Sequence, residues 1–214
     1  MTVYFDLSQP IENGMTHYPG DPEPRLQPAE GIDLPWRVSE LHFGTHTGTH
    51  IDAASHYITG GKTIDQYPLE RFILSGICIS LSGLNPDESI EVERITKFQP
   101  QILKGGALLL QTGWDRYWGK EQYFHHPYLS LSAARSLSEA GVSLLGIDAL
   151  NIDSTAQGTS HAHEILLERD ILIVENLTGL EQLKPGEIYR FACLPLLLAR
   201  LDGSPVRAVA WRVE

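Results

Sequence analysis

The chain has 214 residues, 42% of them hydrophobic, and its 16 Lys plus Arg against 27 Asp plus Glu give a formal net charge of −11. This length predicts one α/β or α+β domain over residues 1–214, with a substantial core. The negative charge repels phosphate backbones and anionic membrane surfaces, so we expect neither nucleic acid nor a membrane as a partner.

The two cysteines, Cys78 and Cys193, each lie within an apolar stretch. We therefore expect small core residues in a reducing compartment rather than a disulfide pair. The N-terminal residues show no basic segment followed by an apolar one, and no run approaches the roughly 18 apolar residues of a membrane span. These features predict a cytoplasmic protein.

In chain order, residues 3–7 (VYFDL) predict a short first strand. Six prolines between positions 10 and 35 predict that residues 9–35 form a long N-terminal arm without regular structure. A strand at residues 37–43 is expected to follow this arm and to lead into a histidine-rich segment.

The remaining chain alternates between apolar runs, which predict strands, and amphipathic patterns, which predict helices. A turn and a short helix start are expected at residues 68–71. The strands are expected at 73–81, 107–111, 142–147, 171–174 and 188–198, and the helices at 91–98, 132–140 and 160–169, with Gly141 ending the second helix. This alternation predicts an α/β fold with a mixed or partly parallel sheet.

The segment from His46 to His56 places three histidines and a carboxylate within eleven residues. Imidazole nitrogens and carboxylate oxygens bind borderline divalent ions such as Zn²⁺ and Mn²⁺ at about 2.0 to 2.2 Å. The candidate donors are His46, His50, Asp52 and His56. A solvated loop with one buried histidine is the alternative, but four donors at this spacing favour a metal site.

Local geometry limits how these donors converge. Four extended residues span roughly 13 Å, so the chain must bend between His46 and His50, and Gly48 allows such a bend. His50 and Asp52 share one face if that piece of chain is extended. His56 can return to the site only through a turn or the first turn of a helix.

A second group of polar residues follows in the C-terminal half. Glu175 ends an apolar strand, where a buried carboxylate is costly unless it is paired or bound to a cation; a solvated glutamate in the next loop is the alternative. His163 lies on an otherwise apolar helix and can equally be a surface histidine. Asp148 and Asp153 follow another apolar strand, where ligand binding, turn formation and helix capping are all open.

Together these residues resemble the metal-dependent cyclase and kynurenine formamidase family of hydrolases. The family signature, His-x-Gly-Thr-His-x-Asp-x-Pro-x-His, matches residues 46–56 except that Ala54 stands in place of proline. The resemblance extends to Tyr18-Pro-Gly-Asp21, Gln111-Thr-Gly-Trp-Asp115, Gly146-Ile-Asp148, and His163 with Glu175.

The resemblance implies a swivelling β/α/β fold, usually assembled as a homodimer or homotetramer. It implies a catalytic, proton-transferring role for His56 and a substrate-binding role for Tyr18, where the formamidase members carry Trp. The implied metal ligands are His46, His50, Asp52, His163 and Glu175. Ala54 in place of proline is expected to loosen one turn without removing a donor.

The predicted function is hydrolysis of a C–N bond in an amide or formamide, or of a lactone C–O bond, by metal-bound hydroxide. The expected substrate is a small aromatic molecule of the N-formylkynurenine type. Zn²⁺ is the expected cofactor, with Mn²⁺ as the alternative, at one or two ions per chain. Tyr57 and Trp114 join Tyr18 as aromatic residues that suit a planar substrate, although each can equally be plain packing.

Two other functions remain open. One is a polyketide-type cyclase or a lactonase that uses the same metal. The other is a non-catalytic, metal-dependent ligand-binding module, which a closed site without exchangeable water would support. Because function resides in the pocket rather than in the fold, the cavity around the donors must discriminate among these classes.

Overall fold

A computed structural model describes residues 2–32, 34–81 and 83–212 of the protein. The strands are β1 (Tyr4–Asp6), β2 (Arg25–Pro28), β3 (Ser39–His42), β4 (His50–Asp52), β5 (Ile73–Ser80), β6 (Ser89–Ile90), β7 (Ala107–Gln111), β8 (Tyr128–Leu129), β9 (Leu144–Ile147), β10 (Leu172–Glu175), β11 (Ile188–Pro195) and β12 (Gly203–Arg212). The α-helices are α1 (Val92–Thr96), α2 (Leu131–Ala140) and α3 (His161–Glu168).

Seven strands close into a mixed barrel in the order β12, β11, β5, β7, β9, β10 and β4, with β4 returning to β12. The consecutive strands β5, β7, β9 and β10 are parallel, and the other pairings of the ring are antiparallel. β1 adds to β12 outside the ring. The predicted α/β class with a mixed sheet is thus confirmed, and closure of the sheet is additional to the swivelling β/α/β arrangement that the resemblance implies.

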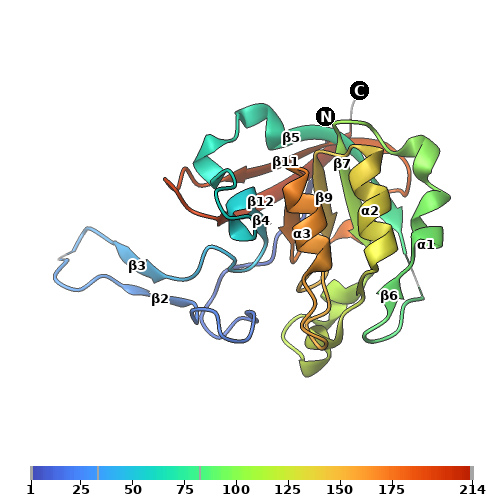
Figure 1. Ribbon diagram of the computed structural model, residues 1–214. Coiled ribbons are helices and arrows are strands. Elements are labelled where there is room, and N and C mark those ends of the chain that lie inside the picture. Colours follow the sequence, from blue (N-terminus) through green and yellow to red (C-terminus); the bar gives the residue numbers. More distant parts are fainter. Residues whose placement is uncertain (1, 33, 82, 213–214) are drawn as a thin grey trace.

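Apolar side chains on both faces of the central strands build two hydrophobic cores. Along β7, Leu108 and Leu110 belong to the core with α2 and α3, whereas Ala107 and Leu109 belong to the core inside the barrel. This division follows from the two-residue period of a strand. The helices α2 and α3 lie side by side against the sheet (Figure 1). Because both faces are covered, these strands are continuous apolar runs.

The predicted helices are present with changes at their ends. α2 begins after Ser130, whose Oγ accepts a hydrogen bond from the backbone N–H of Ala133 (3.1 Å), and it ends at Gly141 with a φ of 75°. These are the usual positions for a serine N-cap and a C-terminal glycine. α1 is shorter than predicted because a separate 3-10 turn with Pro100 follows it. A 3-10 turn, Leu69–Arg71, stands where a helix start is predicted.

Two parts of the fold differ from the sequence prediction. The N-terminal arm is predicted to lack regular structure, but β2 pairs with β3 in a hairpin that projects away from the barrel (Figure 1). No strand is predicted for residues 203–212; the structure has β12 there, paired with β1, β4 and β11. The predicted strand at 188–198 ends at Pro195.

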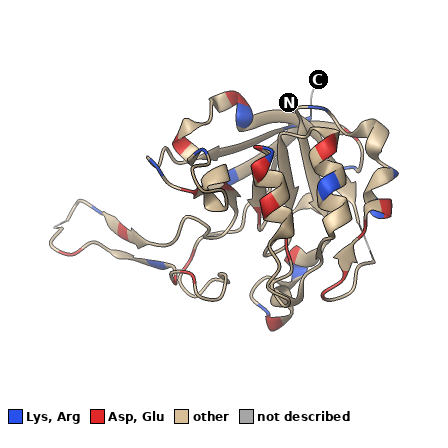
Figure 2. Cartoon of the chain, in the orientation of Figure 1, with Lys and Arg blue, Asp and Glu red and all other residues tan. Residues whose placement is uncertain are grey.

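Charged residues are dispersed along the chain. In Figure 2 most lysine and arginine positions are separated from one another along the ribbon, with aspartate and glutamate positions among them. Within the three described stretches of the chain, no helix has the length and apolar character needed to cross a membrane.

The barrel closes where β12 meets β4, and Gly203 makes this contact possible. Gly203 pairs with Asp52 across the two strands. A Cβ atom at Gly203 would lie 2.8 Å from the carbonyl oxygen of Ile51 and 2.9 Å from Cε1 of His46. The Ile51 carbonyl belongs to the paired strand β4, and the His46 ring is held by Asp52 and Asp202, so a residue without a side chain is required here.

We therefore expect Gly203→Ala to lower the free energy of unfolding by about 1 to 3 kcal/mol, the usual cost of overpacking. Denaturation with urea measures this change. Gly44→Ala is the matched control, because a Cβ there would meet no atom closer than 3.3 Å. Equal stability of Gly203→Ala and the native protein would contradict the steric argument.

Candidate metal centre

Strand β4 and the turns on either side of it carry the first group of predicted donors. Gly48 adopts a left-handed φ of 62°, which confirms the predicted bend before β4. His50 and Asp52 are buried in β4. A 3-10 turn, Ala54–His56, then brings His56 back toward the same place, as the sequence predicts.

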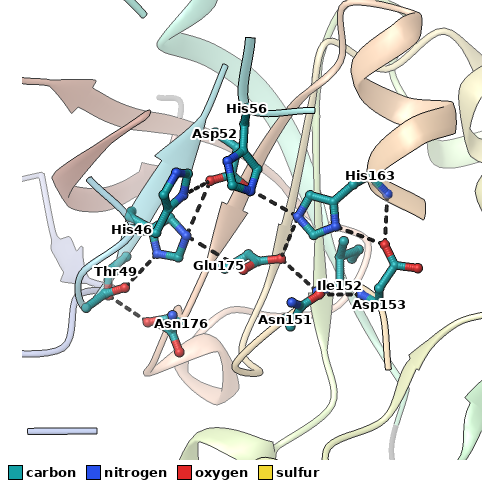
Figure 3. Close-up of polar contacts among 12 residues, drawn as sticks. His46, Thr49, Asp52, His56, Asn151, Ile152, Asp153, His163, Glu175 and Asn176 are labelled. Carbon is teal, nitrogen blue, oxygen red and sulfur yellow. Dashed lines mark hydrogen bonds and ion pairs between the residues drawn. The ribbon is translucent and has the colours of Figure 1, made fainter. Parts of the chain in front are cut away.

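β10 and α3 bring the distal donors to β4. Antiparallel pairing of β10 with β4 places Glu175 opposite His50. His163 on α3 points to the same place (Figure 3), and both His163 and Glu175 are only 4% exposed. The alternatives of a solvated glutamate and a surface histidine are therefore wrong.

The donor atoms of His50, Asp52, His163 and Glu175 lie within 3.3 to 3.6 Å of one another. Nε2 of His50 lies 3.3 Å from Oδ1 of Asp52 and 3.6 Å from Oε2 of Glu175. Nε2 of His163 lies 3.6 Å from Oδ2 of Asp52 and 3.5 Å from Oε1 of Glu175. Ligand atoms at 2.0 to 2.2 Å from a tetrahedral ion are separated by roughly 3.3 to 3.6 Å. Each carboxylate offers one oxygen to each histidine, which suits one ion or two ions that share the carboxylates.

The buried carboxylates also show that a cation fits. Asp52 is fully buried, and its Oδ2 has no hydrogen-bond partner in the part of the chain that the structure describes. Burial raises the pKa of Glu175 to about 7, and repulsion from the Asp52 carboxylate adds to this effect. A divalent cation would bind the unpartnered oxygen and offset the repulsion between the two carboxylates.

Hydrogen bonds orient the two buried histidines. Nδ1 of His50 donates to the carbonyl oxygen of Gly48 (2.9 Å), and Nδ1 of His163 donates to Oδ2 of Asp153 (2.9 Å). In the neutral form of each ring, this leaves Nε2 without a proton and directed at the carboxylates, the arrangement typical of metal-binding histidines. Burial opposes protonation of His163, but the hydrogen bonds to Asp153 and Asp52 and the nearby carboxylate charges raise its pKa, so a bound cation would take the place of that proton.

The structure also resolves the roles of the two further aspartates. Asp153 accepts hydrogen bonds from the backbone N–H groups of Ala162 and His163, so it caps α3. Asp148 accepts hydrogen bonds from the backbone N–H groups of Thr112 and Gly113 and holds that turn. Helix capping and turn formation, rather than direct ligand binding, are the contacts that these residues make.

A second group of side chains lies nearer the surface around Asp202. Nε2 of His46 lies 3.0 Å, and Nδ1 of His56 lies 3.3 Å, from Oδ2 of Asp202. Nδ1 of His46 lies 2.8 Å from Oδ1 of Asp52. Burial alone would lower the pKa of His46, but the hydrogen bonds to Asp202 and Asp52 raise it to about 10.

Asp202 belongs to this site, but no pattern in the sequence indicates it. It lies in the loop before β12, 156 positions from His46. No motif of the histidine segment includes it, and no strand is predicted after it. Only the pairing of β12 with β4 carries Asp202 to the histidines.

His56 differs from the buried donors in exposure and in its neighbours. Its side chain is 28% exposed, and its ring centroid lies 3.9 Å from that of His46 and 5.6 Å from that of His163. Burial lowers the pKa of His56, which favours the neutral imidazole. A neutral imidazole beside the donor cluster can accept a proton and then return it, as general acid–base chemistry requires.

His50, His163 and Glu175 of the donor cluster line a cavity of about 230 Å³, and Asp52 lies buried behind them. Tyr18 and Tyr57 line the same cavity, and the Tyr57 ring stacks on His163 at a centroid distance of 5.6 Å. Trp114 is instead buried in the core, where its Nε1–H donates to the carbonyl oxygen of Gln122. Of the three aromatic residues singled out in the sequence, Trp114 is therefore plain packing.

Comparison with known proteins assigns the family. Residues 5–154 match the family described as "Putative cyclase". The kynurenine formamidase of Bacillus thuringiensis (strain Al Hakam) is 34% identical over 212 residues, which cover 96% of each chain. The chain therefore belongs to the cyclase family, as the resemblance in its motifs indicates.

Solved structures agree with this assignment. A structure described as a potential metal-dependent hydrolase with cyclase activity is 27% identical, covers both chains completely and has a TM-score of 0.85. Isatin hydrolase A from Ralstonia solanacearum has a TM-score of 0.89 at 23% identity, covering 99% of this chain and 92% of that one, which shows a shared fold. With the buried His, Asp and Glu groups, these likenesses place the chain among the metal-dependent hydrolases of the cyclase family.

We expect Asp52→Ala and Glu175→Gln each to weaken binding of a divalent transition metal by about 10-fold or more. Asp52→Ala removes both carboxylate oxygens, and Glu175→Gln replaces one oxygen with an amide nitrogen and removes the negative charge. Competition with a chelator measures the affinity, and circular dichroism checks that the fold persists. Glu168→Gln, which changes an exposed carboxylate on α3, is the matched control. Full metal content in both site variants would show that these carboxylates do not hold the ion.

Proposed function

We propose that the protein is an arylformamidase-like hydrolase that cleaves the C–N bond of a small aromatic formamide of the N-formylkynurenine type. The observation that carries the proposal is the cluster of donor atoms from His50, Asp52, His163 and Glu175 at separations of 3.3 to 3.6 Å, of which all but Asp52 line a cavity. The 34% identity to a kynurenine formamidase over nearly the whole chain supports the choice of substrate class.

Each predicted site residue has a part in this proposal. His50, Asp52, His163 and Glu175 would hold one or two ions, and His46 would join them by giving up its contact with Asp52. Zn²⁺ is the first choice for a His and carboxylate set, and Mn²⁺ is the alternative. A bound divalent ion would lower the pKa of water and polarise the substrate carbonyl. His56 takes up a proton during attack and delivers it to the leaving nitrogen.

The contacts of His56 suit this proton transfer. Nδ1 of His56 faces Asp202, which stabilises a proton at that nitrogen and leaves Nε2 for exchange with the substrate. The side chain lines the cavity rather than the core. Asp202 in turn receives a hydrogen bond from the hydroxyl of Thr45 (3.0 Å), which limits its movement.

The walls of the cavity favour an aromatic substrate. Tyr18 and Tyr57 supply ring faces and hydroxyl groups. Tyr18 stands where the formamidases carry Trp, and its side chain is close enough to Glu175 for that carboxylate to raise the pKa of the phenol, after the larger effect of burial. We assign Tyr18 to substrate binding on these grounds.

His56→Ala is expected to keep most of the bound metal and to lose about 10²- to 10⁴-fold in kcat, the usual contribution of a general acid or base. The assay is hydrolysis of a panel of aryl formamides, with lactones and cyclic amides included because isatin hydrolases share the fold. Asp202→Asn should lose less, since it keeps a polar partner for His56. A native, metal-loaded protein that hydrolyses none of the panel would favour the ligand-binding module.

We also propose that the chain assembles as a homodimer or homotetramer through its N-terminal arm, which in the structure extends to the end of β3 at His42. The hairpin region exposes five large apolar residues, and such exposed apolar groups mark protein interaction sites. A two-stranded hairpin is also only marginally stable in water by itself, so packing against another chain would stabilise it. The five apolar residues are Ile32, Leu34, Trp36, Val38 and Leu41. The free, buried Cys78 and Cys193 support a cytoplasmic location for this assembly.

Trp36→Glu is expected to shift the protein toward a lower oligomeric state, because a charge would replace one of the most exposed rings of the arm. Light scattering coupled to size-exclusion chromatography gives the mass. Leu69→Glu is the control, since Leu69 is similarly exposed, at 67% against 74%, but lies outside the arm. A monomeric native protein, or an unchanged mass in Trp36→Glu, would contradict the proposed role of the arm.

A further inference from the structure

The hydroxyl group of Tyr67 connects two turns of the candidate site. Tyr67 is only 6% exposed. Its oxygen accepts a hydrogen bond from the backbone N–H of Ala54 (3.2 Å), and its proton is donated to Oδ1 of Asp170 (2.8 Å). The buried hydroxyl of Tyr67 is thus both an acceptor and a donor of hydrogen bonds.

The Ala54 side of this contact holds the turn that carries His56. Ala54 is the first residue of the 3-10 turn Ala54–His56, and such a residue has no partner for its N–H within the turn. Proline is common at this position because it lacks that N–H. Ala53 before it is extended, with φ −92° and ψ 162°, the conformation that a following proline requires.

Ala54 departs from the family signature and adds a backbone N–H group that proline would lack. The backbone suits the proline of the signature, but alanine introduces a buried N–H group, which is costly unless it is bound. Tyr67 binds it. The expectation that Ala54 loosens the turn stays a prediction, and the hydrogen bond to Tyr67 is a restraint that would offset the loss of proline.

The Asp170 side of the contact holds the other half of the site. Asp170 lies between α3, which carries His163, and β10, which ends in Glu175. Its carboxylate also accepts hydrogen bonds from Nζ of Lys62 (2.8 Å) and from a guanidinium nitrogen of Arg71 (2.9 Å). This group of charges fixes Asp170, and through it the hydroxyl of Tyr67.

We propose that Tyr67 is a positioning residue that replaces the signature proline and holds His56 in place relative to His163 and Glu175. The ring centroids of His56 and His163 are 5.6 Å apart. The part of the proposal that concerns catalysis rests on the proposed function, whereas the coupling of Tyr67 to Ala54 does not.

The proposal makes tyrosine and proline incompatible at these two positions. In Ala54→Pro, the proline Cδ would replace the amide hydrogen at about 1.5 Å from the nitrogen. The Tyr67 oxygen is 3.2 Å from that nitrogen, which leaves far less than the 3.5 to 4.0 Å of ordinary contact. Tyr67→Phe would remove the hydroxyl oxygen that clashes with the proline ring. The same change would remove the acceptor that the N–H of residue 54 serves.

A double-mutant cycle tests this coupling by thermal unfolding. Tyr67→Phe and Ala54→Pro should each lower Tm by roughly 3 to 8 °C, through an unsatisfied N–H and a clash respectively. The double variant should be at least as stable as Tyr67→Phe. If Ala54→Pro alone does not fold, a folded double variant supports the proposal in the same way. Additive losses of stability in the double variant would overturn it.

Tyr189→Phe provides the matched control. Tyr189 is also buried, and its hydroxyl accepts a hydrogen bond from the backbone N–H of Lys184, away from the turn that carries His56. Its effect should add to that of Ala54→Pro. Rescue of Ala54→Pro by Tyr189→Phe as well would show a general effect and would overturn the specific coupling.

Activity and metal content test the positioning role separately. Tyr67→Phe should keep its metal content and lower kcat by about 3- to 10-fold through misplacement of His56, and the double variant should recover most of this loss. An unchanged kcat in Tyr67→Phe would overturn the positioning role. A native protein without any hydrolase activity would overturn the proposed function, while the Tm cycle would still decide the coupling between Tyr67 and Ala54.

Discussion

The burial of two carboxylates side by side is the constraint on which the candidate site depends. Asp52 and Glu175 lie in paired strands at the wall of an otherwise apolar barrel. Burying two negative charges together is unfavourable unless a cation or a set of donors compensates. The two histidines between them direct Nε2 at the carboxylates while Nδ1 is held by another acceptor, so a metal ion is the compensation that this arrangement suits.

The surroundings divide into a rigid part and an adaptable part. His50 and His163 are held by a backbone carbonyl and by the buried Asp153. His56 and Asp202 lie at the surface of the same cluster, with side chains 28% and 39% exposed. Metal binding requires fixed donors, whereas proton transfer requires access to substrate and solvent. The two demands are met by different residues on different elements.

The barrel explains how so many distant segments reach one place. β4 has only three residues, yet it pairs with both β10 and β12 and so joins the two ends of the sheet. The same short strand carries His50 and Asp52. Closure of the barrel and assembly of the donor cluster are therefore one structural event, and Gly203 permits both by allowing β12 to approach His46.

Sequence alone determined the chemistry of the segment His46–His56, because donors within eleven residues interact through local geometry: a bend at Gly48, an extended pair and one turn. It also indicated Glu175, since a charge that ends an apolar strand is unusual. Only the tertiary structure decided that Asp202 belongs to the site, that the sheet closes, and that Tyr67 binds Ala54. These contacts join residues far apart in the chain, and no local pattern encodes a pairing that depends on packing of the whole barrel.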